Sequence, residues 1–270
     1  MVPIVASVTP NKTKFGPLLY PGELERGIKE LGEFGYDGIE LSLRTIQDVD
    51  ESKLSKMLQD ANMKLYSIAT GQSFIEDGLS LFHVEKEKRD QTVDRLKTFV
   101  DLIDSLGGKA VILGGIRGKI DSSDPESQFA GGADAIESIL AYAEQKKVTL
   151  LLEAINRYET NLFVTVQSCV EFIKERPSDY LKVLGDAFHM NIEEVSMRGA
   201  FDEYADYIGA IHTADSNRLA PGMGHTDFDD LLSNRAAYPN LHYLGVEVLP
   251  LPDSTTCAEV AIQTLHKITR

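Results

Sequence analysis

The stretch VTLLLEA, residues 148–154, is a run of apolar and β-branched residues with a carboxylate, Glu153, near its end. A short apolar run of this kind is typical of a strand in a parallel sheet that is covered on both faces. Seven similar runs occur along the chain, so eight strands are expected. The eight runs are residues 2–8, 37–43, 64–70, 109–115, 148–154, 180–186, 207–213 and 242–248.

Segments with helical periodicity lie between these runs. Examples are GELERGIKELGEFG (22–35) and DAIESILAYAEQKK (134–147), in which apolar residues recur every three or four positions and Gly or Lys stands at the end. This alternation predicts an α/β fold, a (β/α)8 TIM barrel, as a single domain over residues 1–270. An open doubly wound sheet is the alternative, but it would normally carry a Gly-rich nucleotide loop after its first strand, and that position has none.

The composition limits the expected partners and compartment. The formal net charge of -15 opposes binding to a phosphate backbone, and no basic run offsets it, so no nucleic-acid partner is expected. The sequence has no apolar run long enough to span a membrane and no secretion signal at its N-terminus, so neither a membrane partner nor export is expected. The only two cysteines, Cys169 and Cys257, form no disulfide framework or zinc motif, which fits a cytoplasmic location.

Polar residues stand near the ends of four successive predicted strands. Glu153, Asp186, His212 and Glu247 belong to strands five to eight, each about one strand-helix unit from the next. The carboxyl ends of barrel strands meet at the face where TIM-barrel active sites lie, so these side chains are expected to converge. Three buried carboxylates repel one another unless they are neutralised or bind a cation. The donor set suits one divalent ion, Mn²⁺ first, with Mg²⁺ or Co²⁺ as alternatives, better than a structural zinc ion.

Two further polar residues and two loops are candidates for the same face. Glu40, near the end of the second strand, could line the floor of the pocket or form a structural ion pair. Residues 70–84 and 115–126 are the longest stretches without a clear period, and they follow strands three and four, so they are expected to overhang the site as lids. Gln72 lies in the first of these stretches and is a candidate substrate contact.

Four motifs around these strand ends resemble a known family. The chain resembles the xylose isomerase-like TIM barrels of sugar-phosphate isomerases and epimerases, and within them the ketose 3-epimerases of the D-tagatose 3-epimerase type. The likeness extends over essentially the whole chain. The motifs are LLEAINRYE (151–159), GDAFHMNIEE (185–194), HTADSNRLAPGMGHTDF (212–228) and GVEVLPLP (245–252).

The resemblance implies roles for individual residues. It implies that Glu153, Asp186, His212 and Glu247 bind the metal. Independently of the resemblance, Glu153 and Glu247 come from predicted strands separated by two others, so they could flank a substrate and act as the catalytic acid-base pair. The resemblance further implies that three residues orient the substrate, and all three positions match the family's motif. They are Glu159, His189 and Arg218.

A narrower likeness concerns the loops after strands three and four. ATGQSFIEDGLSLFH (69–83) and GGIRG (114–118) look like the branch that contains 5-keto-L-gluconate epimerase. A guanidinium binds a carboxylate in bidentate geometry, so Arg117 could bind the carboxylate of a keto-sugar acid. Arg117 could equally serve only to tether its loop.

The resemblance implies an isomerase that inverts the carbon next to the carbonyl of a ketose or keto-sugar acid through an ene-diolate. The same barrel also hosts aldose-ketose and hydroxypyruvate isomerases and sugar dehydratases, so the fold alone does not select the reaction. A non-catalytic sugar-binding protein is a further alternative. An abasic-site endonuclease fits less well, because its three zinc ions need more ligands and the acidic charge opposes DNA. The expected partner is a small sugar, and a homo-oligomer is left open.

Overall fold

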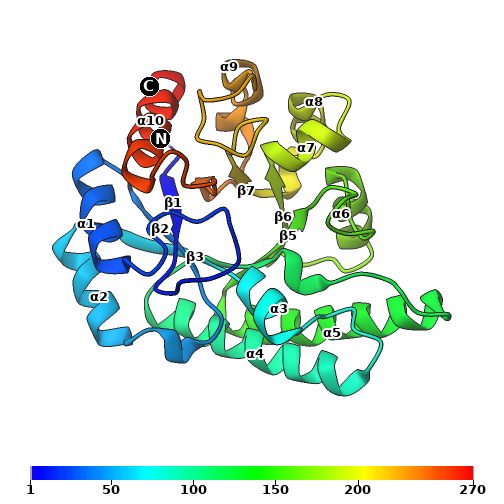
Figure 1. Cartoon of the computed structure of the whole chain (residues 1–270). Helices are drawn as coiled ribbons and strands as arrows, with labels where there is room; N and C mark the ends of the chain where they lie inside the picture. The colour runs from blue at the N-terminus through cyan, green and yellow to red at the C-terminus, as the bar shows by residue number, and fades with distance from the viewer. Residues whose placement is uncertain (1, 270) are drawn as a thin grey trace.

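Eight parallel strands form a closed barrel in the computed structural model, which describes residues 2–269 (Figure 1). Each strand pairs with its neighbour in chain order, and the first strand closes the ring against the last. The predicted (β/α)8 barrel is therefore confirmed, and the open doubly wound sheet is excluded. The strands are β1 (Ile4–Val8), β2 (Gly38–Ser42), β3 (Lys64–Ala69), β4 (Ala110–Leu113), β5 (Thr149–Ala154), β6 (Leu181–Asp186), β7 (Ile208–His212) and β8 (Tyr243–Val246).

Helices surround the barrel, and their ends carry the expected caps. Asp50 and Asp124 cap the helices that follow them by accepting a backbone N–H, and Gly35 ends the first helix in the left-handed conformation, at φ 93°. The helices are α1 (Leu24–Phe34), α2 (Glu51–Asp60), α3 (Gly71–Asp77), α4 (Lys86–Ser105), α5 (Pro125–Lys146), α6 (Val166–Lys174), α7 (Ala187–Glu193), α8 (Met197–Glu203), α9 (Phe228–Leu231) and α10 (Ser254–Thr269). Among residues 2–269, no helix has both the length and the apolar character needed to cross a membrane.

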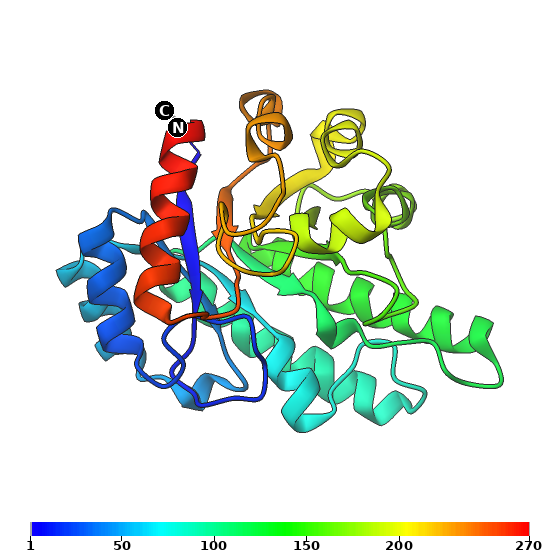
Figure 2. The same cartoon turned by 45° about the horizontal axis from the view of Figure 1, so that its top comes forward.

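The last helix completes the ring beside the first strand. Figure 2 shows α10 in red alongside β1 in blue, and α10 also packs against α1. The strands are buried on both faces, inside against one another and outside against the helices, which explains their nearly continuous apolar sequences.

Side-chain alternation along the strands brings the polar residues to one end of the barrel. Leu151 and Leu184 belong to the cluster that fills the barrel interior. Because alternate residues of a strand point to the same face, Glu153 and Asp186 follow them two positions later into the same space. The apolar interior thus ends in a polar layer at the carboxyl ends of the strands.

The two expected lids are joined to each other. The backbone N–H groups of Leu81 and Phe82 donate to the carbonyl oxygens of Ile116 and Arg117, each at 2.9 Å. The stretch 70–84, which showed no clear period, contains α3, and Leu79, Leu81 and Phe82 are buried. The two loops therefore form a packed wall beside the barrel mouth.

Candidate metal centre and active site

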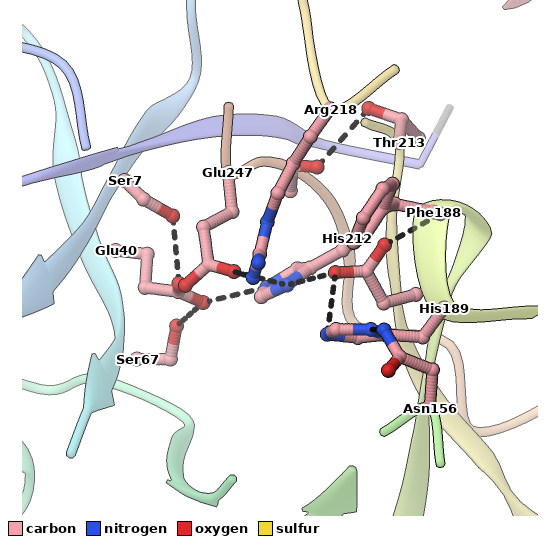
Figure 3. Close-up of polar contacts among 12 residues, drawn as sticks. Ser7, Glu40, Ser67, Asn156, Phe188, His189, His212, Thr213, Arg218 and Glu247 are labelled. Atoms are coloured by element: carbon pink, nitrogen blue, oxygen red, sulfur yellow. Dashed lines mark hydrogen bonds and ion pairs between the residues drawn. The ribbon is translucent and has the colours of Figure 1, made fainter. Parts of the chain in front are cut away.

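The four predicted metal ligands lie together at the carboxyl end of the barrel. One ligand atom from each of Glu153, Asp186, His212 and Glu247 lies within 4.8 Å of the others, and all four residues are buried. The first three come from the ends of β5, β6 and β7, and Glu247 directly follows β8. Figure 3 shows Glu247 and His212 converging on this point.

The electrostatics of the cluster favour a bound cation. Burial raises the pKa of Glu153 to about 7, with a further contribution from the Asp186 charge. Burial likewise raises the pKa of Asp186, and it holds the pKa of Glu247 well above its ordinary value. Asp186 Oδ2 and His212 Nδ1 are buried without a hydrogen-bond partner. A divalent ion would neutralise the carboxylates and supply the missing partner, so the four donors fit such an ion.

A buried carboxylate holds the histidine ligand from behind. Glu40 accepts hydrogen bonds from Ser7 Oγ (2.7 Å) and Ser67 Oγ (2.8 Å), and it lies 3.2 Å from His212 Nε2 (Figure 3). It also accepts a hydrogen bond from the Tyr243 hydroxyl (2.9 Å). Burial alone would lower the pKa of His212, but the charge and hydrogen bond of Glu40, together with the charges of Glu247 and Asp186, outweigh burial and raise that pKa well above its ordinary value. Of the two roles considered for Glu40, the structure shows the structural ion pair. This contact at His212 Nε2 orients the ring so that Nδ1 faces the other candidate ligands.

A cavity of about 280 Å³ opens next to the cluster. Glu153 and Glu247 line it, whereas Asp186 and His212 are not among the lining residues that the structure describes. The two glutamates therefore face any bound molecule, and the other two ligands lie behind them. The wall contributed by the loops after β1 and β3 is apolar and includes Phe15, Phe74 and Ile75.

The three predicted substrate-orienting residues form the opposite, polar wall. Arg218 Nη1 lies 3.2 Å from Glu159 Oε1, and Arg218 Nη2 lies 3.9 Å from Glu247 Oε2. His189 Nε2 lies 3.9 Å from Asp186 Oδ2. Burial, with the nearby positive charge of Arg218, lowers the pKa of His189 well below its ordinary value, so the ring is neutral. All three residues line the cavity.

The loop that carries Arg218 is organised by one buried carboxylate that the sequence did not single out. Asp215 is fully buried, and its pKa is lowered because backbone N–H bonds outweigh the effect of burial. Arg218 adopts a left-handed backbone conformation, with φ 63°, which residues other than glycine seldom adopt. The signal in the sequence was an Asp ahead of a glycine-rich turn. The four donors to Asp215 are the N–H groups of Ser216, Gly222, Gly224 and Thr226.

Arg117 is buried at the edge of the cavity. Its side chain has 0 % of its surface exposed, Nη1 donates to the backbone carbonyl of Glu153, and the guanidinium lies over the Phe163 ring at 5.9 Å. Nε and Nη2 have no hydrogen-bond partner among residues 2–269. Arg117 thus supports the backbone of a metal ligand, and carboxylate binding by Arg117 stays a prediction.

The side chain of Gln72 forms hydrogen bonds with residues that follow β1 and with the end of β2. Its Nε2 donates to Thr9 Oγ1 (2.9 Å) and to the Ser42 carbonyl (3.0 Å), and its Oε1 accepts from Asn11 Nδ2 (3.1 Å). Gln72 is not among the described residues that line the cavity. The structure therefore shows a structural role for Gln72, because the start of α3 turns this amide toward the loop after β1. A substrate contact by Gln72 stays a prediction.

Gly114 lies too close to Glu153 to accept a side chain. A Cβ atom at Gly114 would meet Glu153 Oε2 well inside van der Waals contact. We expect Gly114→Ala to displace this carboxylate and lower kcat/KM roughly 100-fold, since small misplacements in a site have effects of this size. The matched control is Gly115→Ala, whose Cβ would meet Phe74 Cδ1 at an ordinary 3.6 Å. Equal activity of the two variants would show that this close contact does not matter.

Comparisons with known proteins find one matching TIM-barrel family and several similar sugar epimerases. Residues 28–248 match the family described as xylose isomerase-like TIM barrel. The chain is similar to an L-ribulose 3-epimerase of Mesorhizobium japonicum, with 33% identity over 208 residues, which cover 76% of this chain and 69% of that protein. It is also similar to the 3-dehydro-D-guloside 4-epimerase of Escherichia coli, with 23% identity over 229 residues, 81% of this chain and 84% of that protein. A solved structure of an L-ribulose 3-epimerase superimposes with a TM-score of 0.82 at 25% identity, covering 99% of this chain and 94% of that one.

Proposed function

Because the chain belongs to the xylose isomerase-like TIM barrel family, we propose that it is a metal-dependent sugar epimerase that inverts the carbon next to a carbonyl group. One observation carries this proposal: two buried glutamates, Glu153 and Glu247, face the same cavity and also belong to the metal-ligand cluster. The names of both relatives describe inversion beside a carbonyl, at carbon 3 of a ketose and at carbon 4 of a 3-keto sugar. The common chemistry is removal and return of a proton at that carbon.

The two glutamates are placed to act as the acid and the base. A bound divalent ion supplies polarisation of the substrate carbonyl, which makes the neighbouring C–H acidic. Glu153 and Glu247 come from strands separated by two others, so one carboxylate can remove the proton from one face of the carbon. The other, in its acid form, then donates a proton to the opposite face of the ene-diolate, and the reverse reaction exchanges their roles. In the metal-free protein, burial and then the Glu153 charge raise the pKa of Glu247 well above its ordinary value, because two buried carboxylates oppose each other's ionisation.

The polar wall positions the sugar. Arg218 and His189 line the cavity and can donate hydrogen bonds to a bound sugar, and Glu159 accepts from the Arg218 guanidinium at 3.2 Å. Such positioning lowers the barrier because the reacting carbon is held between acid and base before the proton moves.

The expected substrate is a ketose or a keto-sugar acid. A neutral ketose is favoured first, because Arg117, the candidate carboxylate contact, has no exposed side-chain surface. We propose Mn²⁺ as the ion, since carboxylate and imidazole ligands suit it. The cysteines Cys169 and Cys257 are free and buried, which fits the proposed cytoplasmic location.

Isotope exchange with solvent tests the proposal. The protein with added Mn²⁺ is incubated in D2O with L-ribulose, D-psicose, D-tagatose or 5-keto-L-gluconate. We expect the epimer to form with deuterium at the carbon next to the ketone, because the hydrogen added to the opposite face comes from the second glutamate, whose acidic hydrogen has exchanged with solvent. Mass spectrometry and NMR measure the label and its position, and protein treated with a chelator is the control.

The products separate the alternative functions. An aldose product would indicate an isomerase, and loss of water would indicate a dehydratase. Binding of a sugar without any exchange would indicate a non-catalytic protein. Each of these results would contradict the proposed epimerase.

A further inference from the structure

Asn156 occupies a buried position between a metal ligand and the polar wall. It follows β5 in the segment that connects Glu153 to Glu159, and only 2% of its surface is exposed. Its backbone carbonyl accepts the N–H groups of Glu159 (3.1 Å) and Thr160 (3.2 Å). Figure 3 shows its side chain against the ring of His189.

The hydrogen bonds of Asn156 fix the orientation of its carboxamide. Oδ1 accepts the backbone N–H of Tyr158 at 3.0 Å, so the oxygen must face that donor. Nδ2 faces two acceptors on the other side, His189 Nδ1 at 2.7 Å and Glu159 Oε1 at 3.4 Å. A rotated carboxamide would place its NH2 group against the Tyr158 N–H, where two donors would oppose each other.

This orientation determines which nitrogen of His189 carries the proton. An amide nitrogen only donates, so His189 Nδ1 must accept and must lack a proton. The proton of the ring therefore lies on Nε2. That nitrogen faces the metal-ligand cluster, 3.9 Å from Asp186 Oδ2, and His189 lines the cavity.

We propose that Asn156 is a positioning residue that fixes His189 in its Nε2–H form, so that His189 donates a hydrogen bond to a substrate oxygen and does not accept one. The proposal rests on the proposed epimerase function for its consequence. A donor at this place suits a carbonyl oxygen, or a hydroxyl oxygen that gains negative charge as the ene-diolate forms. The same donor would repel a substrate that presents an N–H group or a cation to His189 Nε2.

The variant Asn156→Asp reverses the polarity of the contact at nearly constant size. An ionised Asp side chain accepts from Tyr158 N–H as before, but it can only accept from His189 Nδ1. The proton is then expected on Nδ1. The ¹⁵N NMR signals of His189, recorded without substrate at about pH 8, where free imidazole is neutral, report this directly. We expect a protonated Nε2 in the wild type and a protonated Nδ1 in the variant.

The kinetic effect should follow the change of tautomer. We expect kcat/KM for the best ketose to fall roughly 10- to 100-fold in Asn156→Asp, the range found when the partner of a site histidine is removed. Asn156→Ala should leave both tautomers populated and give an intermediate loss. Asn161→Asp is the matched control, because Asn161 lies in the same loop between β5 and α6 and its carboxamide, among residues 2–269, bonds only the backbone of Ile120. This control should retain the wild-type tautomer and activity.

The outcomes separate this inference from the proposed function. A wild-type His189 with its proton on Nδ1, or an unchanged tautomer in Asn156→Asp, would overturn the inference. The wild-type spectrum needs no variant, so a variant that fails to fold does not remove the test. If the tautomer is as expected but the wild type converts no sugar, the proposed function fails and the role of Asn156 stands.

Discussion

Glu153→Gln and Glu247→Gln should each lower kcat by about 10³-fold or more, which would abolish measurable turnover. Glutamine keeps the size of the side chain and one oxygen ligand, but its carboxamide neither accepts nor donates a proton near neutral pH. General acid-base catalysis contributes roughly 10²- to 10⁴-fold, and both partners are needed for inversion. The measurement is the initial rate of epimer formation with saturating Mn²⁺.

Isotope exchange sharpens the test of the two glutamates. A variant with one remaining glutamate can remove a proton and return a deuteron to the same face, so any residual exchange should occur without inversion. The control is Glu51→Gln, an exposed residue at the start of α2, which should retain full activity. Substantial epimerisation by either site variant would remove that glutamate from the acid-base pair, while its place among the metal ligands would still stand.

Removal of the metal should both stop the reaction and weaken the fold. Binding to the folded state alone stabilises it by about 2.7 kcal/mol at a ligand concentration 100 times Kd. For a chain of this size, that corresponds to a rise in Tm of roughly 5 to 10 °C on addition of Mn²⁺. Thermal unfolding with chelator and with Mn²⁺ measures the shift. In Asp186→Asn, which removes one ligand charge, the shift should largely disappear; an equal shift in this variant would place the ion elsewhere.

Both the stability of the metal-free protein and its stabilisation by Mn²⁺ should depend on pH. In the metal-free protein, burial raises the pKa of Glu153 from 4.5 to about 7, so the folded state binds more protons than the unfolded state between these values. The stability of the metal-free protein should therefore fall as the pH rises through this window. Protons also compete with the ion, so Mn²⁺ affinity should fall as the pH drops below about 7. Stabilisation by the ion should thus be largest above neutral pH.

The barrel and the metal cluster could be predicted because both follow from short-range patterns. Eight apolar runs specify eight buried strands, and alternation along β5 and β6 places Glu153 and Asp186 in the direction of Leu151 and Leu184. These inferences need only the periodicity of a strand and the rule that barrel sites lie at one end.

The loop contacts could not be predicted in the same way. The place of Gln72 depended on how α3 turns after β3, and a polar residue near a strand end can bond a neighbouring loop as well as a substrate. Asn156 bonds the side chain of His189, 33 residues away, and Asp215 accepts a backbone N–H group as far as 11 residues away, so only the folded loops reveal these partners. Two roles for Glu40 stayed open because the sequence does not show that Glu40 lies next to His212.

The two walls of the cavity come from different halves of the barrel. The apolar wall, with Phe15 and Phe74, belongs to loops after β1 and β3, whereas β5 to β8 carry the ligands and Arg218 follows β7. Mutations in the apolar wall, at Phe15 or Phe74, can therefore reshape what the cavity accepts without changing the groups that transfer protons. A gene for this barrel could acquire a new sugar preference by substitutions in this wall while the chemistry carried by β5 to β8 stays the same.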